Sequence, residues 1–488
     1  MIKCVLILTT LAFALTSFQT GHTRILNVPS DYATIQAGID EALDGDTVLV
    51  APGEYQEYLQ LADKNILLSA SDGPDTTIIQ GRCWINGQID TTCVIKGFSF
   101  ISNGSNGLSL LSLGPDAAPV IEADILHGNF MATAGGAIAC WGGNPIIRSN
   151  IISNNFATFI GGGICFENSS APCTSHAEVT GNIIYNNWAA AAYGSGNGGG
   201  IYLLGDATIK YNLIYDNLAS MYYSGGGGHG GGIARVGSSQ AHKTTITNNT
   251  IVNNSARIHT SSGIGGGIYL NIQSPLDTLI VKNNIIAFNP LGGNVRASLN
   301  DSVYCQWDYN LIFGDTTSVF PHGDHDIFLD PIFADTASDN YHLLPGSPCI
   351  DSGDPTFPLD PDSTRADIGA YYFDQAVGID EPGPSGPYRF ALAQNYPNPF
   401  NARTVISYTL DKDAKVSLLI YSITGQRVKS LTIGESQQAG EHRYIWDGVD
   451  SRGKAVSTGI YFYELYVDDP AETTAGKYRE SKAMILVR

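Results

Sequence analysis

A short apolar phrase enclosed by asparagines recurs through the middle of the chain and decides the fold. Five copies are clear: Asn150-Ile-Ile-Ser-Asn-Asn155, Asn182-Ile-Ile-Tyr-Asn-Asn187, Asn212-Leu-Ile-Tyr-Asp-Asn217, Asn249-Thr-Ile-Val-Asn-Asn254 and Asn284-Ile-Ile-Ala-Phe-Asn289. Weaker copies begin at Asp124 and Asn310, and neighbouring copies start 26 to 37 residues apart. A repeat of this length is typical of solenoid proteins, in which similar units stack on one another.

A second phrase lies between the first ones and marks the same register: Gly161-Gly-Gly-Ile164, Gly198-Gly-Gly-Ile201, Gly230-Gly-Gly-Ile233 and Gly265-Gly-Gly-Ile268. The apolar runs hold only two to four residues between Gly or Asn, which favours short strands over helices. One unit cannot bury its apolar face alone, so the units must stack. We therefore expect an all-β right-handed parallel β-helix, the handedness following from the crossover rule for parallel strands.

The opening of the solenoid has its own pattern. Residues 31–43 carry apolar side chains at 32, 35, 39 and 43, which predicts a helix over the open end, with Ser30 or Asp31 as its cap. This opening and the Asn/Gly-rich coils resemble the pectin-lyase-like family of right-handed β-helix proteins. Tyr341–Asp354 and Ala366–Tyr371 resemble the segment that closes many secreted bacterial members. The resemblance covers residues 25–373 and implies the β-helix fold.

The composition changes after the solenoid. Residues 374–387 are rich in Pro and Gly and predict a linker, and residues 388–488 hold alternating strands that predict an Ig-like β-sandwich. Four phrases there resemble the C-terminal sorting domain of type IX secretion: Asn395-Tyr-Pro-Asn-Pro-Phe-Asn401, Ile420–Val428, Trp446-Asp-Gly448 and Ser457-Thr-Gly-Ile-Tyr461. The resemblance implies export across an outer membrane, with the type IX machinery as a partner. An Ig-like module without an export role is the alternative.

The N-terminus and the charge bound the location and the partners. Residues 1–22 contain Lys3 and the apolar run Val5–Leu15, which predicts a secretory signal peptide; a short anchor is the alternative. No later run is long enough for a transmembrane segment. The 488 residues have a net charge of −20, which argues against nucleic acid as a partner. We expect a secreted protein, or one on the outer surface of a Gram-negative-type bacterium.

Export would place the cysteines in an oxidising compartment. Of the eight, Cys4 belongs to the signal peptide, so at least one of the others stays unpaired. The closest pairs are Cys83 with Cys93 and Cys165 with Cys173, which would staple local loops. No pair has the spacing of a zinc site.

Enzymatic motifs are incomplete. Gly53-Glu-Tyr-Gln-Glu57 matches a phrase of pectin methylesterases, but their later catalytic phrases are absent, so we interpret it as a structural element of the first coil. Gly228-His229-Gly230 resembles a phrase of polygalacturonases, again without its companions. A lyase would need an Arg or Lys base and usually Ca²⁺; the basic candidates are Arg235, Lys243, Arg257 and Lys282. We therefore name no catalytic residue, and expect no cofactor unless Ca²⁺ serves a lyase.

The densest polar cluster is His322-Gly-Asp-His-Asp326, which we interpret as part of the coil-closing segment rather than as a metal site. The same stretch contains two His and two Asp residues, so metal binding is the alternative. No metal is expected elsewhere.

Coil insertions give the better functional signal. They follow the Asn-Asn phrases at Thr158–Ile160, Ala189–Asn197, Ala219–His229 and Arg257–Ile264. Because they leave successive coils at one point, we expect them to line one face. Aromatic rings there suit sugar rings, and His or Arg supplies hydrogen bonds; the alternative is that the rings only anchor the loops. The candidate ligand-binding residues are Trp188, Tyr193, Tyr222, Tyr223, His229, Arg257 and His259.

The function expected from these features is a secreted or cell-surface β-helix protein that binds a glycan or presents loops to a partner. The alternative is a polysaccharide lyase, hydrolase or epimerase, acting from the loop face on a polysaccharide, with uronate-containing polymers among the candidates. One scaffold hosts many functions, so the fold alone does not separate the two.

Overall fold

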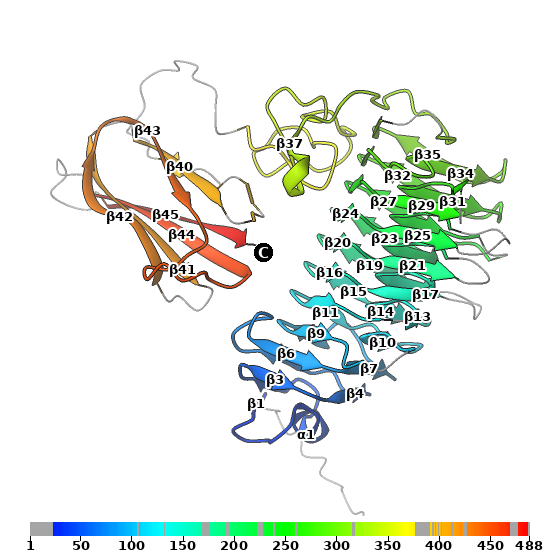
Figure 1. Ribbon diagram of the computed structural model, residues 1–488, viewed down its shortest axis with the longest axis horizontal. Helices are drawn as coiled ribbons and strands as arrows, with labels where there is room; N and C mark the ends of the chain where they lie inside the picture. The colour runs from blue at the N-terminus through cyan, green and yellow to red at the C-terminus, as the bar shows by residue number, and fades with distance from the viewer. Residues whose placement is uncertain are drawn as a thin grey trace, which may run out of the picture.

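The computed structural model describes most of the chain (Figure 1). The described residues are 23–104, 107–130, 132–167, 176–191, 196–221, 228–237, 240–258, 261–314, 318–375, 391–392, 395, 397–398, 400–401, 403–410, 413–422, 427–468 and 477–486. The signal peptide expected at residues 1–22 and nearly all of the expected linker lie outside them. No helix among the described residues is both long and apolar enough to cross a membrane.

The solenoid is built from stacked parallel sheets, as the sequence predicts (Figure 1). Two sheets run its whole length. Sheet A contains β1 (Ile25–Val28), β2 (Thr47–Val50), β5 (Leu67–Ala70), β8 (Val94–Lys96), β11 (Val120–Glu122), β15 (Ile146–Arg148), β19 (His176–Thr180), β23 (Asp206–Lys210), β27 (Lys243–Thr247), β32 (Thr278–Lys282) and β35 (Tyr304–Asp308). Sheet B contains β3 (Gly53–Tyr55), β6 (Thr77–Gln80), β9 (Ser99–Ile101), β12 (Ile125–His127), β16 (Ile151–Ser153), β20 (Ile183–Tyr185), β24 (Leu213–Tyr215), β28 (Thr250–Val252), β33 (Ile285–Ala287) and β36 (Leu311–Phe313).

Two further sheets complete the coils. Sheet C appears only from the fourth coil on, and contains β13 (Ala132–Ala134), β17 (Phe156–Ile160), β21 (Trp188–Ala191), β25 (Leu218–Met221), β29 (Ser255–Ile258) and β30 (Ser261–Ser262). Sheet D contains β4 (Tyr58–Ala62), β7 (Arg82–Asn86), β10 (Leu111–Leu113), β14 (Ile138–Cys140), β18 (Ile164–Glu167), β22 (Ile201–Leu204), β26 (Ile233–Arg235), β31 (Ile268–Ile272) and β34 (Val295–Leu299). All neighbours pair in parallel except β29 and β30.

The repeated phrase sets the register of the coils. In the strands of the repeated phrase the middle residue points inward, and Ile152, Ile184, Ile214, Ile251 and Ile286 stack in register with no exposed surface. Burial of an aliphatic side chain of this size stabilises the fold by about 1.5–3 kcal/mol. The core of the solenoid is therefore a column of the same apolar side chains that the repeat displays.

Two ladders of buried asparagines hold the corners on either side of sheet B. At most steps, the side-chain oxygen of one Asn accepts hydrogen bonds from both the backbone N–H and the side-chain amide of the preceding ladder residue. Asn182, for example, accepts both from Asn150, at 2.9 and 3.0 Å. The first ladder ends in carboxylates, Asp124 at one end and Asp326 at the other. Because each corner turns through buried backbone, these amides satisfy groups that no strand can reach.

A short helix, α1 (Ile35–Glu41), covers the open end of the solenoid, and is shorter than the predicted one. Its N-cap is Thr34, not Ser30 or Asp31. The carboxylate of Glu57 accepts hydrogen bonds from the backbone N–H groups of Ile35 and Gln36, both at 2.9 Å. A carboxylate at a helix N-terminus accepts hydrogen bonds from free N–H groups and is stabilised by the positive end of the helix dipole. The Gly-x-Tyr-x-Glu phrase thus has a structural role here.

The segment after the last coil folds back over the outer face of sheet B. It contains β37 (Phe333–Asp335), the 3-10 helix η1 (Thr336–Ser338) and β38 (Asn340–Leu343). Tyr341, Leu343, Cys349 and Ile368 from this segment form one apolar cluster with outward-facing residues such as Leu213. The segment that resembles a closing segment therefore covers the outer face of sheet B.

The polar cluster at residues 322–326 belongs to the end of the solenoid. Asp326 accepts hydrogen bonds from the indole of Trp307, at 2.9 Å, and from the backbone N–H of Asn310, at 2.9 Å. His325 stacks on Tyr309 and bonds to Asp308 at 2.9 Å. These contacts tie the cluster to the last coil.

Near the end of the closing segment, one carboxyl group carries a perturbed pKa. Asp367 is 3% exposed and accepts hydrogen bonds from the backbone N–H groups of Asp351, at 2.7 Å, and Phe373, at 2.6 Å. Burial, followed by the nearby carboxylates of Asp360 and Asp351, raises the pKa of Asp367 to about 7.

Asp367 should therefore make stability depend on pH. Its folded pKa lies above the unfolded value, so its contribution is present at low pH and is lost as the pH rises towards 7. Urea unfolding of the wild type and of Asp367→Asn checks this: between about pH 5 and 7.5 the wild type should lose about 2 kcal/mol relative to the variant. Comparing the two cancels the opposite trend from His127, His229 and His342, whose pKa values burial lowers. A constant difference would contradict the prediction.

The C-terminal domain is an antiparallel sandwich, as expected. One sheet contains β39 (Ala391–Leu392), β40 (Thr404–Leu410) and β43 (Gly440–Trp446), and the other contains β42 (Arg427–Gln437), β41 (Ala414–Ser422), β44 (Gly459–Asp468) and β45 (Lys477–Leu486). Trp446 and Tyr463 lie in its core with no exposed surface. The apolar positions alternate along the strands, so one face of each sheet is buried.

The predicted cysteine pairing is wrong for the one pair that can be assessed. Cys83 and Cys93 are both free thiols buried inside the solenoid, and Cys173, the expected partner of Cys165, lies outside the described residues. The six cysteines within the described residues are all free. They serve as small apolar residues of the core and its coverings.

Candidate functional site

An aromatic row lies at the start of sheet C, on three consecutive coils. The rings of Phe130 and Phe156 stack with centroids 5.5 Å apart, and Trp188 meets Phe156 edge-on at 5.0 Å. Phe130 is 66% exposed, whereas Phe156 and Trp188 are half-buried. We call these three residues the aromatic row.

The second asparagine ladder positions these rings. Each ring follows a ladder residue directly, as Phe130 follows Asn129, and Phe156 and Trp188 are the first residues of β17 and β21. The following residues, Ala157 and Ala189, point inward and are fully buried. Alternation along the strand then directs Phe156 and Trp188 outward.

Only Trp188 of this row was predicted. Sequence reasoning placed the aromatic face in the insertions and missed Phe130 and Phe156, which stand at the equivalent position of the two preceding coils. The signal was present in the repeat, because an aromatic residue follows the closing Asn in Asn129-Phe130, Asn155-Phe156 and Asn187-Trp188.

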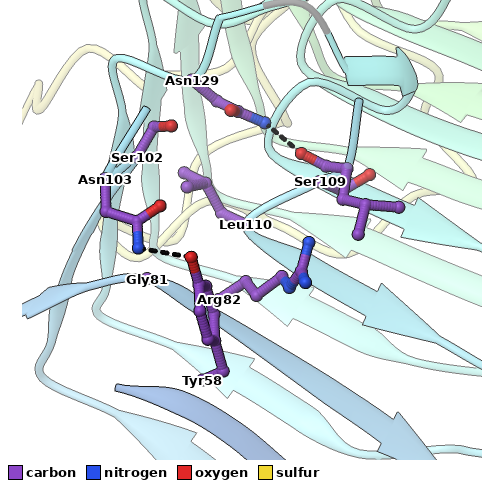
Figure 2. Close-up of a pocket in the computed structure, with 9 residues that line it drawn as sticks. Tyr58, Gly81, Arg82, Ser102, Asn103, Ser109, Leu110 and Asn129 are labelled. Carbon is purple, nitrogen blue, oxygen red and sulfur yellow. Dashed lines mark hydrogen bonds between the residues drawn. The ribbon is translucent and has the colours of Figure 1, made fainter. Parts of the chain in front are cut away.

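A shallow notch adjoins the row on its N-terminal side (Figure 2). It extends from the first coils to the start of sheet C, and its lining includes Tyr58, Arg82, Asn103, Leu108 and Asn129. Its enclosed space measures about 10 Å³, which is room for roughly one water molecule. A ligand larger than a small substituent must therefore lie along the surface here.

Hydrogen bonds fix the walls of the notch. The amide of Asn129 donates to the backbone oxygen of Leu108 at 2.8 Å, and that of Asn103 donates to the Tyr58 hydroxyl at 2.6 Å (Figure 2). The Arg82 guanidinium lies over the Tyr58 ring, 4.7 Å from its centroid. Because Asn129 immediately precedes Phe130, the notch and the aromatic row form one continuous surface, which we call the strip.

The other predicted residues lie elsewhere. The ring of His229 packs against Tyr269 of sheet D at 4.7 Å, and burial lowers its pKa, which favours neutral imidazole. Arg257 is exposed on β29. The four remaining candidates, Tyr193, Tyr222, Tyr223 and His259, lie outside the described residues.

The insertions do leave the coils in register. Asn197 pairs with Ile160 of the coil before it, and His229 pairs with Ile264 of the coil after it. Trp188 nevertheless contacts Phe156, whereas His229 contacts Tyr269, so the predicted residues divide between two clusters.

The four basic candidates for a catalytic base do not lie together either. Arg235 is fully buried inside the solenoid, next to Asp277. Lys282 pairs with Asp354 of the closing segment at 2.7 Å. Lys243 and Arg257 are exposed. Within the described residues, no three His, Cys, Asp or Glu side chains come close enough together to hold a metal ion.

Comparisons with known proteins agree with the two-part architecture. The family model of the FlgD Ig-like domain matches residues 400–470. No curated protein matches the chain. The chain thus combines a parallel β-helix with a C-terminal Ig-like domain.

Three solved structures resemble parts of the chain. The pectate lyase Pel9A is 13% identical with a TM-score of 0.39, over 72% of this chain and 97% of that one. The PL6 family alginate lyase AlyGC is 13% identical with a TM-score of 0.31, over 65% and 55%. Latent PorU from Porphyromonas gingivalis is 22% identical with a TM-score of 0.18, over 21% of this chain and only 10% of PorU. At these values no activity is transferred to the chain.

Proposed function

We propose that the protein is an exported, secreted or cell-surface β-helix that binds an extended glycan along the strip. The observation that carries the proposal is the contact of three aromatic rings on three consecutive coils, with Phe130 66% exposed at one end. Aromatic faces pack well against the apolar faces of sugar rings. Neighbouring coils are about 4.8 Å apart, which is comparable to the length of one sugar unit in an extended chain.

Export forms the second part of the proposal. The apolar run at Val5–Leu15 supports a signal peptide, and the phrases of the C-terminal domain support a sorting role with the type IX machinery as partner. The match to an Ig-like family agrees with the sandwich but not with any particular role for it.

The enzymatic alternative stays a prediction. Of the four basic candidates, Arg235 and Lys282 are engaged in ion pairs, and no observation on the described residues favours a reaction. A chain that only binds would leave a bound polymer intact, which a product assay would reveal.

Alanine in place of Phe130 tests the binding proposal. The exposed ring contributes little to folding, so the melting temperature should stay unchanged while glycan affinity falls about tenfold, as expected for loss of about 1.4 kcal/mol of ring packing. Affinity electrophoresis of the full chain against a panel of soluble polysaccharides measures this.

The matched control is Tyr304→Ala, since Tyr304 is 58% exposed but lies on sheet A. Trp188→Ala should act like Phe130→Ala. Equal retention of the wild type and both row variants on every bound glycan would refute the role of the strip.

A further inference from the structure

We infer that Arg82 makes the N-terminal end of the strip specific for an anionic group on the glycan, either a carboxylate or a sulfate ester. This inference rests on the proposed glycan binding and adds to it the chemical class of the ligand. Its basis is a guanidinium that is held in place at the notch but has no acidic partner among the described residues.

The position of the guanidinium is fixed by its neighbours. Arg82 on β7 is the register partner of Tyr58 on β4, so both side chains leave the same face of sheet D. The guanidinium carbon lies 4.7 Å from the centre of the Tyr58 ring, and Asn103 donates a hydrogen bond to the Tyr58 hydroxyl (Figure 2). A cation over an aromatic face is held by the ring, while the edge of the guanidinium keeps its N–H donors available.

Several other cations of the solenoid have an acidic partner, whereas Arg82 has none among the described residues. Arg24 pairs with Asp46 at 2.6 Å, Arg148 with Glu122 at 2.5 Å and Lys210 with Glu178 at 2.9 Å. Arg82 forms no ion pair or hydrogen bond within the part of the chain that the structure describes, and its guanidinium lies over the Tyr58 ring.

The residues next to the notch that lie outside the described ranges add no acidic partner for Arg82. The gap in the described chain next to the notch consists of Ser105 and Asn106, and neither carries a charge. The guanidinium thus has no carboxylate supplied by this loop.

The size of the notch selects the ligand group. The guanidinium presents a planar set of N–H donors that matches carboxylate or sulfate oxygens in a bidentate geometry. The notch accommodates about one water molecule, so a sugar ring cannot enter it, and a charged substituent would lie across its opening beside the guanidinium. Asn129 lines the notch together with Arg82 and precedes Phe130, so a glycan that stacks on the row would extend next to the notch.

The charge of the whole chain sharpens the inference. At a net charge of −20 the protein repels polyanions, so general electrostatic attraction does not explain binding to an acidic glycan. Any such affinity must come from local cations, and the strip offers Arg82.

Arg82→Gln in the full chain tests the inference with three probes: polygalacturonate for carboxylates, dextran sulfate for sulfate esters, and neutral hydroxyethylcellulose. We expect the wild type to bind at least one anionic probe more tightly than the neutral one. The variant should lose about fivefold or more of that affinity and most of its salt dependence, with neutral binding unchanged. The probe that responds identifies carboxylate or sulfate.

Arg148→Gln is the control, because it removes an arginine from the outer face of sheet A. If Arg82→Gln leaves anionic binding unchanged, or weakens neutral binding equally, the inference is wrong. Loss of binding in Phe130→Ala alone would then keep the proposed function while rejecting the role of Arg82. A wild type that binds only the neutral probe rejects the inference too, and one that binds none rejects both.

Discussion

Replacing Asn217 with alanine should lower the free energy of unfolding by about 3 kcal/mol or more. Asn217 is 1% exposed and occupies the middle of the second asparagine ladder. Its side-chain oxygen accepts hydrogen bonds from the backbone N–H and the amide of Asn187, both at 3.0 Å. Its amide donates to the backbone oxygens of Ile184 and Tyr215, both at 2.9 Å.

Alanine removes all of these bonds and supplies nothing in their place. The backbone N–H of Asn187 would stay buried without a partner, at a cost of about 1–3 kcal/mol, and the backbone oxygens of Ile184 and Tyr215 would each lose one hydrogen bond. Because coils are stabilised mainly by their neighbours, a weak corner should also loosen the adjacent coils.

Urea unfolding followed by circular dichroism measures the loss. The control is Asn186→Gly, since Asn186 is exposed, has a φ of 56° and lies at the equivalent corner of the preceding coil. Glycine adopts that backbone conformation readily, so the control should change stability by no more than about 0.5 kcal/mol. Similar losses for both variants would show that the ladder contributes no more than the exposed turn.

The ladder also explains how much of the fold the sequence predicts. Each phrase begins and ends with an Asn that must be buried at a corner, so the repeat defines strand, corner and coil together. Ile214 and its equivalents then point inward by alternation alone. Local pattern and tertiary packing agree throughout the coils, and the β-helix follows from the repeat.

Prediction failed where a partner lies far away in sequence. The helix cap shifted to Thr34 because Glu57, one coil later, supplies the acceptors for the first turn. Cys83 and Cys93 are close in sequence, but their side chains fill the core, and proximity along the chain says little about pairing there. The aromatic row was missed for the opposite reason. The sequence pattern that marks it is local, an aromatic residue after the closing Asn of the repeat, but the search was confined to the insertions.

The largest departure from pattern is Arg235, which stands where the neighbouring coils have leucine. It pairs in register with Leu203 and Leu270, both fully buried, so its side chain enters the solenoid with no exposed surface. The guanidinium meets Asp277 at 3.3 Å and donates to the hydroxyl of Thr244 at 3.1 Å. Burial lowers the pKa of Arg235, and the carboxylate of Asp277 opposes that shift.

Arg235→Leu should therefore destabilise the protein by about 3–5 kcal/mol, although leucine suits the position by pattern and size. The loss comes from Asp277, whose side chain is 1% exposed and would keep its charge in the core without the arginine. Its other oxygen accepts a hydrogen bond from the backbone N–H of His242 at 2.7 Å, a bond that asparagine can also accept. The double variant Arg235→Leu/Asp277→Asn should hence regain most of the lost stability.

Urea unfolding of the two single variants and the double variant measures the coupling between these side chains, which should exceed about 2 kcal/mol. Arg257→Leu serves as the control for loss of an arginine, because Arg257 is exposed on β29. If the stability changes of the two single variants add up to that of the double variant, loss of the ion pair does not account for the destabilisation by Arg235→Leu. Strong coupling would instead show that a buried charge is held at this coil by one carboxylate, which explains how an arginine persists at a leucine position.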